Sequence, residues 1–126
     1  MLSHPMINLY TQDVPRLVGF YESLGFTETF RTPKDGVPDH VEVRLDHVTL
    51  AVSSVEAAVT HHDFTPDLGG RPVEIVLWSD DTDGDYARVT AGGAPAVSPP
   101  RDFGDALRVA RVEDPDGNPL QIVQRR

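Results

Sequence analysis

The chain has 126 residues, a mass of 13.8 kDa and a formal net charge of −9 at pH 7. Its 39% hydrophobic and 25% charged residues are typical of a globular protein that forms one domain or two small repeats. Proteins bind nucleic-acid phosphates through basic patches, so the acidic balance predicts that nucleic acid is not a partner. The sequence contains no cysteine, which excludes disulfides and thiolate metal sites.

The sequence also lacks signals for membranes and export. No apolar run approaches the roughly 20 residues that are needed to cross a bilayer, so we expect no membrane association. The stretch from Met1 to Pro5 lacks the basic and apolar regions of a signal peptide. We therefore expect a cytoplasmic protein.

The first half of the chain predicts one helix among several strands. Asp13 is a favourable N-cap, Pro15 is tolerated in the first helical turn, and apolar residues recur at helical spacing until Gly25. Apolar and polar residues alternate on both sides of this helix, as they do in half-buried strands. The predicted strands cover residues 6–11, 26–31, 40–45 and 47–53.

Residues 54–71 interrupt the alternation. A short helix could form over 55–60, whereas 61–70 is rich in loop-forming residues and begins with His61 and His62. This adjacent pair could bind a metal or could be solvated. We interpret 54–71 as a linker between modules 1–53 and 72–126 of a single domain, 1–126.

The second half repeats the order of the first. Alternation predicts a strand over 73–79, a helix capped by Asp80 or Asp81 that ends at Gly92-Gly93, a short strand over 96–99 and a loop over 100–105. A hairpin follows, in which 107–112 and 119–123 flank a type I turn. Its turn has Asp, Pro and Gly at the favoured positions, in Asp114-Pro115-Asp116-Gly117.

The two halves match in pattern rather than in residue identity. A shift of 68 positions places Met6 on Glu74, Tyr10 on Trp78 and the first helix on the second. This repeat predicts an α+β fold made of two tandem βαβββ modules.

Three motifs resemble those of a known family. They are the helix that ends in Phe20-Tyr21-Glu22-Ser23-Leu24-Gly25-Phe26, the helix from Asp80-Asp81 to Gly92-Gly93-Ala94, and the turn Asp114-Pro115-Asp116-Gly117-Asn118. Their order and spacing resemble the vicinal oxygen chelate superfamily, which includes glyoxalase I, extradiol dioxygenases and bleomycin-resistance proteins. The resemblance covers essentially the whole chain. It implies two βαβββ modules whose mixed sheets curl into a cup, and it implies a homodimer.

Enzymes of this family commonly hold a divalent metal on cup-facing strand positions. The equivalent positions here are Met6, Ala51, Glu74 and Gln121. Met6 and Ala51 offer no suitable donor, Glu74 could ligate, and Gln121 could ligate weakly. The resemblance therefore implies a member without a metal or other cofactor, closest in character to the metal-free bleomycin-resistance-like proteins.

A cup without a metal suits a small organic ligand, held by aromatic walls and a few polar groups. Rings at Tyr10 and Trp78 favour a flat or aromatic ligand, such as a natural product or antibiotic that the protein sequesters. The predicted ligand contacts are Tyr10, Glu42, His47, Glu74, Trp78, Phe103 and Gln121. Among them, His47 is a candidate proton shuttle, and Phe103 is a candidate lid over the cup.

The alternative hypothesis is an enzyme that depends on Glu74. In an apolar cup, this carboxylate could act as a general base or as a metal ligand, in a lyase, isomerase or dioxygenase-like enzyme. It could instead form an ion pair with Arg44 or Arg108. The sequence alone leaves these roles open.

Overall fold

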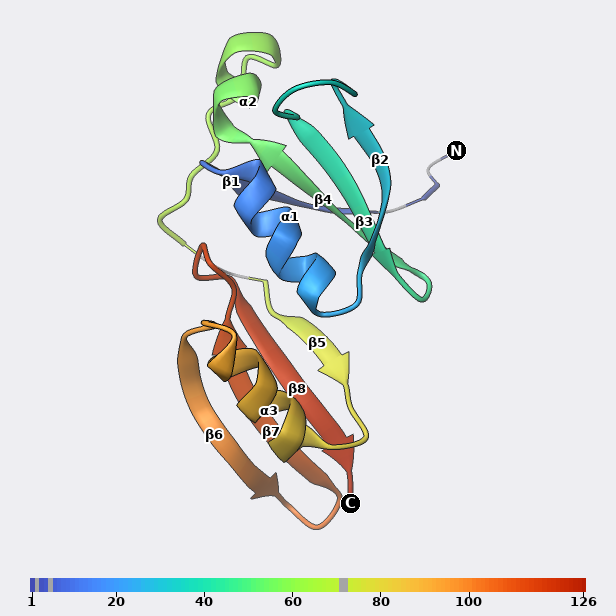
Figure 1. The fold of residues 1–126 in the computed structure, drawn as a ribbon, viewed down its shortest axis with the longest axis vertical. Coiled ribbons are helices and arrows are strands. Elements are labelled where there is room, and N and C mark those ends of the chain that lie inside the picture. Colours follow the sequence, from blue (N-terminus) through green and yellow to red (C-terminus); the bar gives the residue numbers. More distant parts are fainter. Residues whose placement is uncertain (2, 5, 71–72) are drawn as a thin grey trace. The chain divides into compact units, whose positions relative to one another are not determined.

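In a computed structural model, the chain divides into two compact units, Met1–Leu68 and Gly69–Arg126 (Figure 1). The structure describes residues 1, 3–4, 6–70 and 73–126. Positions 71–72, where the sequence predicts the linker to end, lie outside the described residues. Each unit contains a four-stranded mixed sheet with a helix packed on it, which confirms the predicted α+β fold of two tandem βαβββ modules.

The first unit is built on a sheet with the strand order β1-β4-β3-β2. Strand β1 runs parallel to β4, whereas the β2–β3 and β3–β4 pairs are antiparallel. The elements are β1 (Ile7–Thr11), α1 (Val14–Ser23), β2 (Thr27–Thr32), β3 (His40–Leu45), β4 (Val48–Ser54) and α2 (Val55–His61).

Helix α1 covers one face of this sheet and leaves polar side chains on the other. The carboxylate of Asp13 caps the helix by accepting a hydrogen bond from the Arg16 backbone N–H at 3.2 Å. Leu17 and Tyr21 are completely buried between the helix and the strands. Because side chains alternate along a strand, residues on the helix face are apolar and their neighbours point to the opposite face, where Phe30 is 49% exposed.

Helix α2 follows β4 directly and belongs to the first unit. The Ser54 hydroxyl caps it by accepting a hydrogen bond from the Ala57 backbone N–H at 3.0 Å. Ala57 and Ala58 are buried. The possible helix over 55–60 is thus present, and it packs beside β4.

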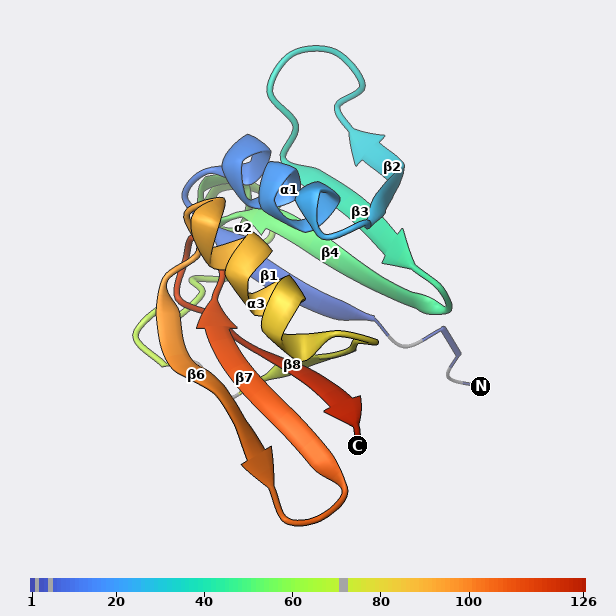
Figure 2. The same cartoon turned by 60° about the horizontal axis from the view of Figure 1, so that its bottom comes forward.

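The second unit repeats this arrangement, with the strand order β5-β8-β7-β6. Helix α3 packs on β6, β7 and β8, as Figure 2 shows. Strand β5 runs parallel to β8, and the other pairs are antiparallel. The elements are β5 (Ile75–Trp78), α3 (Thr82–Ala91), β6 (Ala96–Phe103), β7 (Leu107–Glu113) and β8 (Pro119–Arg125).

The predicted hairpin between β7 and β8 is present, and a buried carboxylate organises its turn. The Gly117 N–H donates to the Asp114 carbonyl at 3.0 Å, and Gly117 has a φ of 87°, which a residue with a side chain adopts only under strain. Asp114 is 1% exposed, and its carboxylate accepts hydrogen bonds from the Asp116 N–H, the Asn118 N–H and the Asn118 side chain. These bonds fix the start of β8.

The predicted loop over 100–105 is wrong in part, because β6 continues to Phe103. Strand β6 lies at the edge of its sheet and pairs only with β7 among the described strands. Its register shifts between Ala96 and Ser98 and again between Ser98 and Arg101. Proline cannot donate to a strand ladder, but an edge strand with bulges accommodates Pro99 and Pro100.

Among the described helices, none is long and apolar enough to cross a membrane.

Candidate functional site

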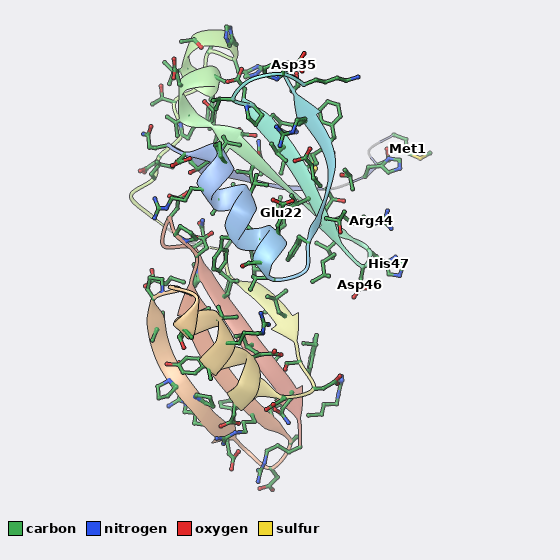
Figure 3. The ribbon with its side chains drawn as sticks, in the orientation of Figure 1. Met1, Glu22, Asp35, Arg44, Asp46 and His47 are labelled. Carbon is green, nitrogen blue, oxygen red and sulfur yellow. The ribbon has the colours of Figure 1, made fainter. Side chains whose placement is uncertain are left out.

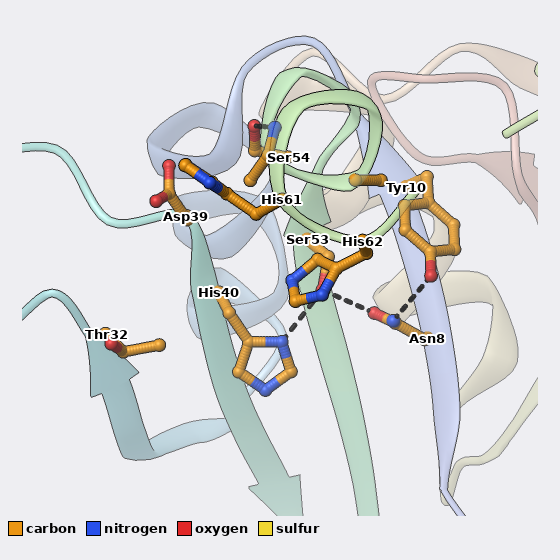
Figure 4. Close-up of a pocket in the computed structure, with 11 residues that line it drawn as sticks. Asn8, Tyr10, Thr32, Asp39, His40, Ser53, Ser54, His61 and His62 are labelled. Atoms are coloured by element: carbon orange, nitrogen blue, oxygen red, sulfur yellow. Dashed lines mark hydrogen bonds between the residues drawn. The ribbon is translucent and has the colours of Figure 1, made fainter. Parts of the chain in front are cut away.

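A cavity of about 610 Å³ opens on the polar face of the first unit, between the sheet and α2 (Figure 4). Its size falls within the usual range of small-molecule sites, about 300–1,000 Å³. Strands β1, β3 and β4 supply its floor, and α2 supplies one wall. The lining residues are Asn8, Tyr10, Thr32, Asp39, His40, Ser53, Ser54, Ala57, Ala58, His61 and His62.

Strand register brings the polar lining residues together. Ser53 on β4 is the partner of Tyr10 on β1 and of His40 on β3, so these three side chains form a row across the sheet. The next row on the same face contains Asn8 and Glu42, on either side of Ala51. The floor of the cavity therefore comes from alternate positions on three neighbouring strands.

These side chains form a continuous hydrogen-bonded chain, drawn in part in Figure 4. Glu42 Oε2 lies 2.9 Å from His40 Nε2, and His40 Nδ1 lies 2.8 Å from Ser53 Oγ. Ser53 Oγ donates to Asn8 Oδ1 at 2.7 Å, and Asn8 Nδ2 donates to the Tyr10 hydroxyl at 3.1 Å. The chain joins a carboxylate to a phenol that lines the cavity.

Aromatic rings flank both ends of this hydrogen-bonded chain. The ring of Tyr10 lies 5.6 Å from that of Phe64, tilted by 60°. The ring of Phe30 packs edge-on against His40, with a centroid distance of 6.0 Å. Both are geometries that aromatic pairs favour. Tyr10 and His40 line the cavity, whereas Phe64 and Phe30 support them from behind without lining it.

The second unit contains the oxygen atoms of two predicted metal positions, and an arginine bridges them. Arg111 Nε donates to Glu74 Oε2 at 2.8 Å, and Arg111 Nη2 donates to Gln121 Oε1 at 2.7 Å. Glu74 is thus paired with Arg111 rather than with Arg44 or Arg108. Arg108 instead binds Asp83, with its Nη2 2.8 Å from Asp83 Oδ1, and this guanidinium lowers the pKa of the Asp83 carboxyl.

The remaining family metal positions do not fit a divalent ion. Met6 is 44% exposed and carries a thioether, and Ala51 is completely buried and has no donor atom. A guanidinium already lies between the oxygens of Glu74 and Gln121. Within residues 1, 3–4, 6–70 and 73–126, no group of three or more His, Asp and Glu side chains is placed to hold a metal ion.

Trp78 ends β5 as an exposed ring, 58% accessible, with an arginine over its face. The Arg125 guanidinium carbon lies 4.3 Å from the ring centroid, which is a cation–π geometry. A shallow cavity of about 390 Å³ adjoins the pair. Its lining residues are Trp78, Ser79, Asp80, Gln124 and Arg125.

Two other predicted contacts, His47 and Phe103, belong to different units. His47 is in the exposed turn between β3 and β4, as Figure 3 shows, at the opposite end of β3 from His40. Phe103 is the last residue of β6 and is 65% exposed. Of the predicted ligand contacts, Tyr10 and Glu42 share the hydrogen-bonded chain of the first unit. Glu74 and Gln121 share Arg111 in the second.

His40 and Ser53 were not predicted as site residues. The alternation of His40 with Glu42 on one strand face could have indicated them, since both side chains point to the same side of β3. The contact of His40 with Ser53 depends on the register of β3 against β4, which the sequence pattern does not specify.

The match to a family model covers residues 2–122 and has the description Glyoxalase/Bleomycin resistance protein/Dioxygenase superfamily. The chain belongs to this superfamily. A search of curated proteins found no match.

Solved structures of other proteins share this fold. TioX from Micromonospora sp. ML1 is 26% identical, with a TM-score of 0.74 over 97% of this chain and 98% of TioX. TnmS3, an antibiotic binding protein from Streptomyces sp. CB03234, is 25% identical, with a TM-score of 0.68 over 99% of this chain and 98% of TnmS3. A bleomycin resistance determinant encoded on the transposon Tn5 is 22% identical, with a TM-score of 0.64 over 98% of each chain.

Proposed function

We propose that this superfamily member binds a flat, aromatic small molecule without a metal, and that it sequesters a natural product or antibiotic. The observation that carries the proposal is the cavity of about 610 Å³ on the first unit, which is lined by the Tyr10 ring and by the polar chain that ends on it. A few positioned polar groups among aromatic walls are what recognition of such a ligand requires. The description of TnmS3 as an antibiotic binding protein supports an antibiotic as the ligand.

Metal independence is part of this proposal, and its support is the chemistry of the family metal positions. Two of the positions have no suitable donor atom, and the oxygens of Glu74 and Gln121 accept hydrogen bonds from Arg111. A divalent ion between these two oxygens would have to displace a guanidinium of the same sign of charge. The arginine therefore takes the place that a cation would need.

The alternative function is an enzyme of the lyase, isomerase or dioxygenase type that uses Glu74 as a base or a metal ligand. The ion pair with Arg111 counts against it, because Glu74 Oε2 already accepts a hydrogen bond from Arg111 Nε at 2.8 Å, and a base or a metal ligand would need that oxygen. Stoichiometric metal in the purified protein, lost on Glu74→Ala, would favour the enzyme over the binder.

We also propose that the protein is a cytoplasmic homodimer. Each unit exposes large apolar side chains on its sheet, such as Phe30 at 49% in the first and Val76 at 47% in the second. Association of two chains would bury such residues. Light scattering should then give a mass of about twice 13.8 kDa, and a monomeric mass would contradict the dimer.

The binding proposal is tested with a panel of planar aromatic compounds, by thermal shift and then by calorimetry. A ligand at 100 times its Kd stabilises the folded state by about 2.7 kcal/mol, which raises Tm by several degrees. Tyr10→Ala should weaken binding, whereas the matched control Tyr86→Ala on α3 should not. If no planar aromatic compound raises Tm, or if both variants bind alike, the proposed site is wrong.

A further inference from the structure

The hydrogen-bonded chain of the first unit has a direction, because each hydroxyl carries a single proton. Ser53 Oγ donates its proton to Asn8 Oδ1, so it can only accept from His40 Nδ1. The Glu42 carboxylate accepts a proton from His40 Nε2. This arrangement makes both ring nitrogens of His40 donors, which requires the ring to be an imidazolium paired with Glu42. In this arrangement, the Tyr10 oxygen accepts from Asn8 and its own proton is available to the cavity.

A second arrangement has His40 neutral and exchanges the oxygen and nitrogen of the Asn8 amide, while the other side chains keep their positions. Nε2 keeps its proton toward Glu42, and Nδ1 accepts the proton of Ser53. Ser53 must then accept from the Asn8 amide nitrogen, which requires the amide to turn over. Its oxygen now faces Tyr10 and accepts the phenolic proton, so that the Tyr10 oxygen offers only lone pairs to the cavity.

We propose that the protonation state of His40 sets whether Tyr10 donates or accepts a hydrogen bond in the cavity, so that the protonated form selects aromatic ligands with a carbonyl group. This inference rests on the proposed function and adds the ligand's chemistry to it. A carbonyl oxygen can only accept, so it pairs with the Tyr10 proton of the imidazolium form. An alcohol or phenol can also donate, so it keeps a partner in both forms.

The coupling works by rotation of an amide rather than by transport of protons. When the Asn8 carboxamide turns over, its oxygen and nitrogen exchange places. Deprotonation of His40 therefore exchanges donor and acceptor in each hydrogen bond from Ser53 to Tyr10. Other titratable groups that line the same cavity are Asp39 before β3, and His61 and His62 at the end of α2. Their charges also change the electrostatic potential in the cavity, but no dashed line in Figure 4 joins them to the hydrogen-bonded chain.

Nuclear magnetic resonance tests the coupling without a ligand. Between about pH 5 and about pH 8, where histidines change charge, the ring nitrogens of His40 and the side-chain amide of Asn8 are followed together. Coupling predicts that the Asn8 signals shift with the same midpoint as His40, and that this shift is lost in His40→Gln but kept in the control His4→Gln. Asn8 signals that stay constant while His40 titrates would overturn the inference.

Binding then tests the ligand class with a matched pair of probes, 9-fluorenone and 9-fluorenol. One hydrogen bond gained or lost predicts that fluorenone binds about threefold to tenfold more tightly on the acid side of the His40 midpoint, with a smaller change for fluorenol. The same preference in His40→Gln would assign it to other groups and overturn the inference. Binding of both probes with a constant ratio would overturn the inference but leave the aromatic binder intact, whereas no binding of either probe at any pH would contradict both.

Discussion

Replacement of Arg111 by leucine tests the account of the second unit most directly. The substitution removes the hydrogen bonds of 2.8 Å to Glu74 and 2.7 Å to Gln121 while keeping an aliphatic stem on β7. The side chains of Arg111 and Glu74 are 34% and 33% exposed, so water screens their charges and can hydrate the carboxylate that is left. Exposed pairs typically contribute up to about 1 kcal/mol, and hydrogen bonds to charged groups contribute somewhat more.

We therefore expect Arg111→Leu to lower the free energy of unfolding by about 1 kcal/mol, as measured by urea denaturation. A double-mutant cycle with Glu74→Gln should give a coupling energy of the same order. A loss above about 3 kcal/mol would refute the reasoning, because it would mean that the pair is desolvated in the folded protein.

The same variant bears on metal chemistry. Leucine leaves two oxygen donors, from Glu74 and Gln121, and the divalent sites of proteins usually need at least three protein ligands. We expect that Zn²⁺ raises the Tm of neither the wild type nor Arg111→Leu. Stabilisation of the variant alone would show that the guanidinium excludes a metal from a site that is otherwise competent, and stabilisation of both would contradict metal independence.

Four further predictions concern the second unit. Asp114→Ala should cost about 3–5 kcal/mol in urea denaturation, because the buried N–H groups of the β7–β8 turn lose their acceptor; a cost below 1 kcal/mol would contradict that role. Trp78→Ala should lower the free energy of unfolding by less than about 1 kcal/mol, since the ring is mostly exposed. Arg125→Ala should change the fluorescence of Trp78, and an unchanged spectrum would argue against the contact between the two side chains. The folded-state pKa of Asp83 is lowered by Arg108, so its contribution is present above the unfolded pKa of about 4 and is lost as the pH falls through the folded pKa. Asp83→Asn should therefore reduce the acid dependence of stability, and an unchanged pH profile would contradict the pairing.

The fold was predictable because several local signals agreed at each element. Asp13 and the apolar spacing marked α1, and the Asp-Pro-Asp-Gly turn placed Gln121 on the face opposite Leu120 and Ile122. The predicted loop over 100–105 was wrong in part because prolines are typical of loops, and the sequence does not distinguish a loop from a bulged edge strand such as β6.

The candidate site was less predictable, because its contacts cross between strands. Tyr10 and Glu42 were predicted as ligand contacts of the cup, and both belong to the hydrogen-bonded chain. His40 and Ser53 join that chain only through the pairing of β3 with β4, and Arg111 reaches Glu74 through the order of β5, β8 and β7. Sequence patterns give the face of a strand but not its neighbour or register. The roles of His47, Phe103 and Trp78 in ligand binding stay predictions.

The prolines of β6 have a consequence for how chains can associate. An unprotected edge strand offers a row of free N–H and C=O groups that can recruit another chain into a continuous sheet, which is a route to aggregation. Pro99 and Pro100 have no backbone N–H group to donate, and the register shifts of β6 bend the strand. Extension of the sheet by a strand of another chain is therefore disfavoured at β6. The apolar sheet faces can then contact a ligand or a second copy of the chain without polymerisation through this edge.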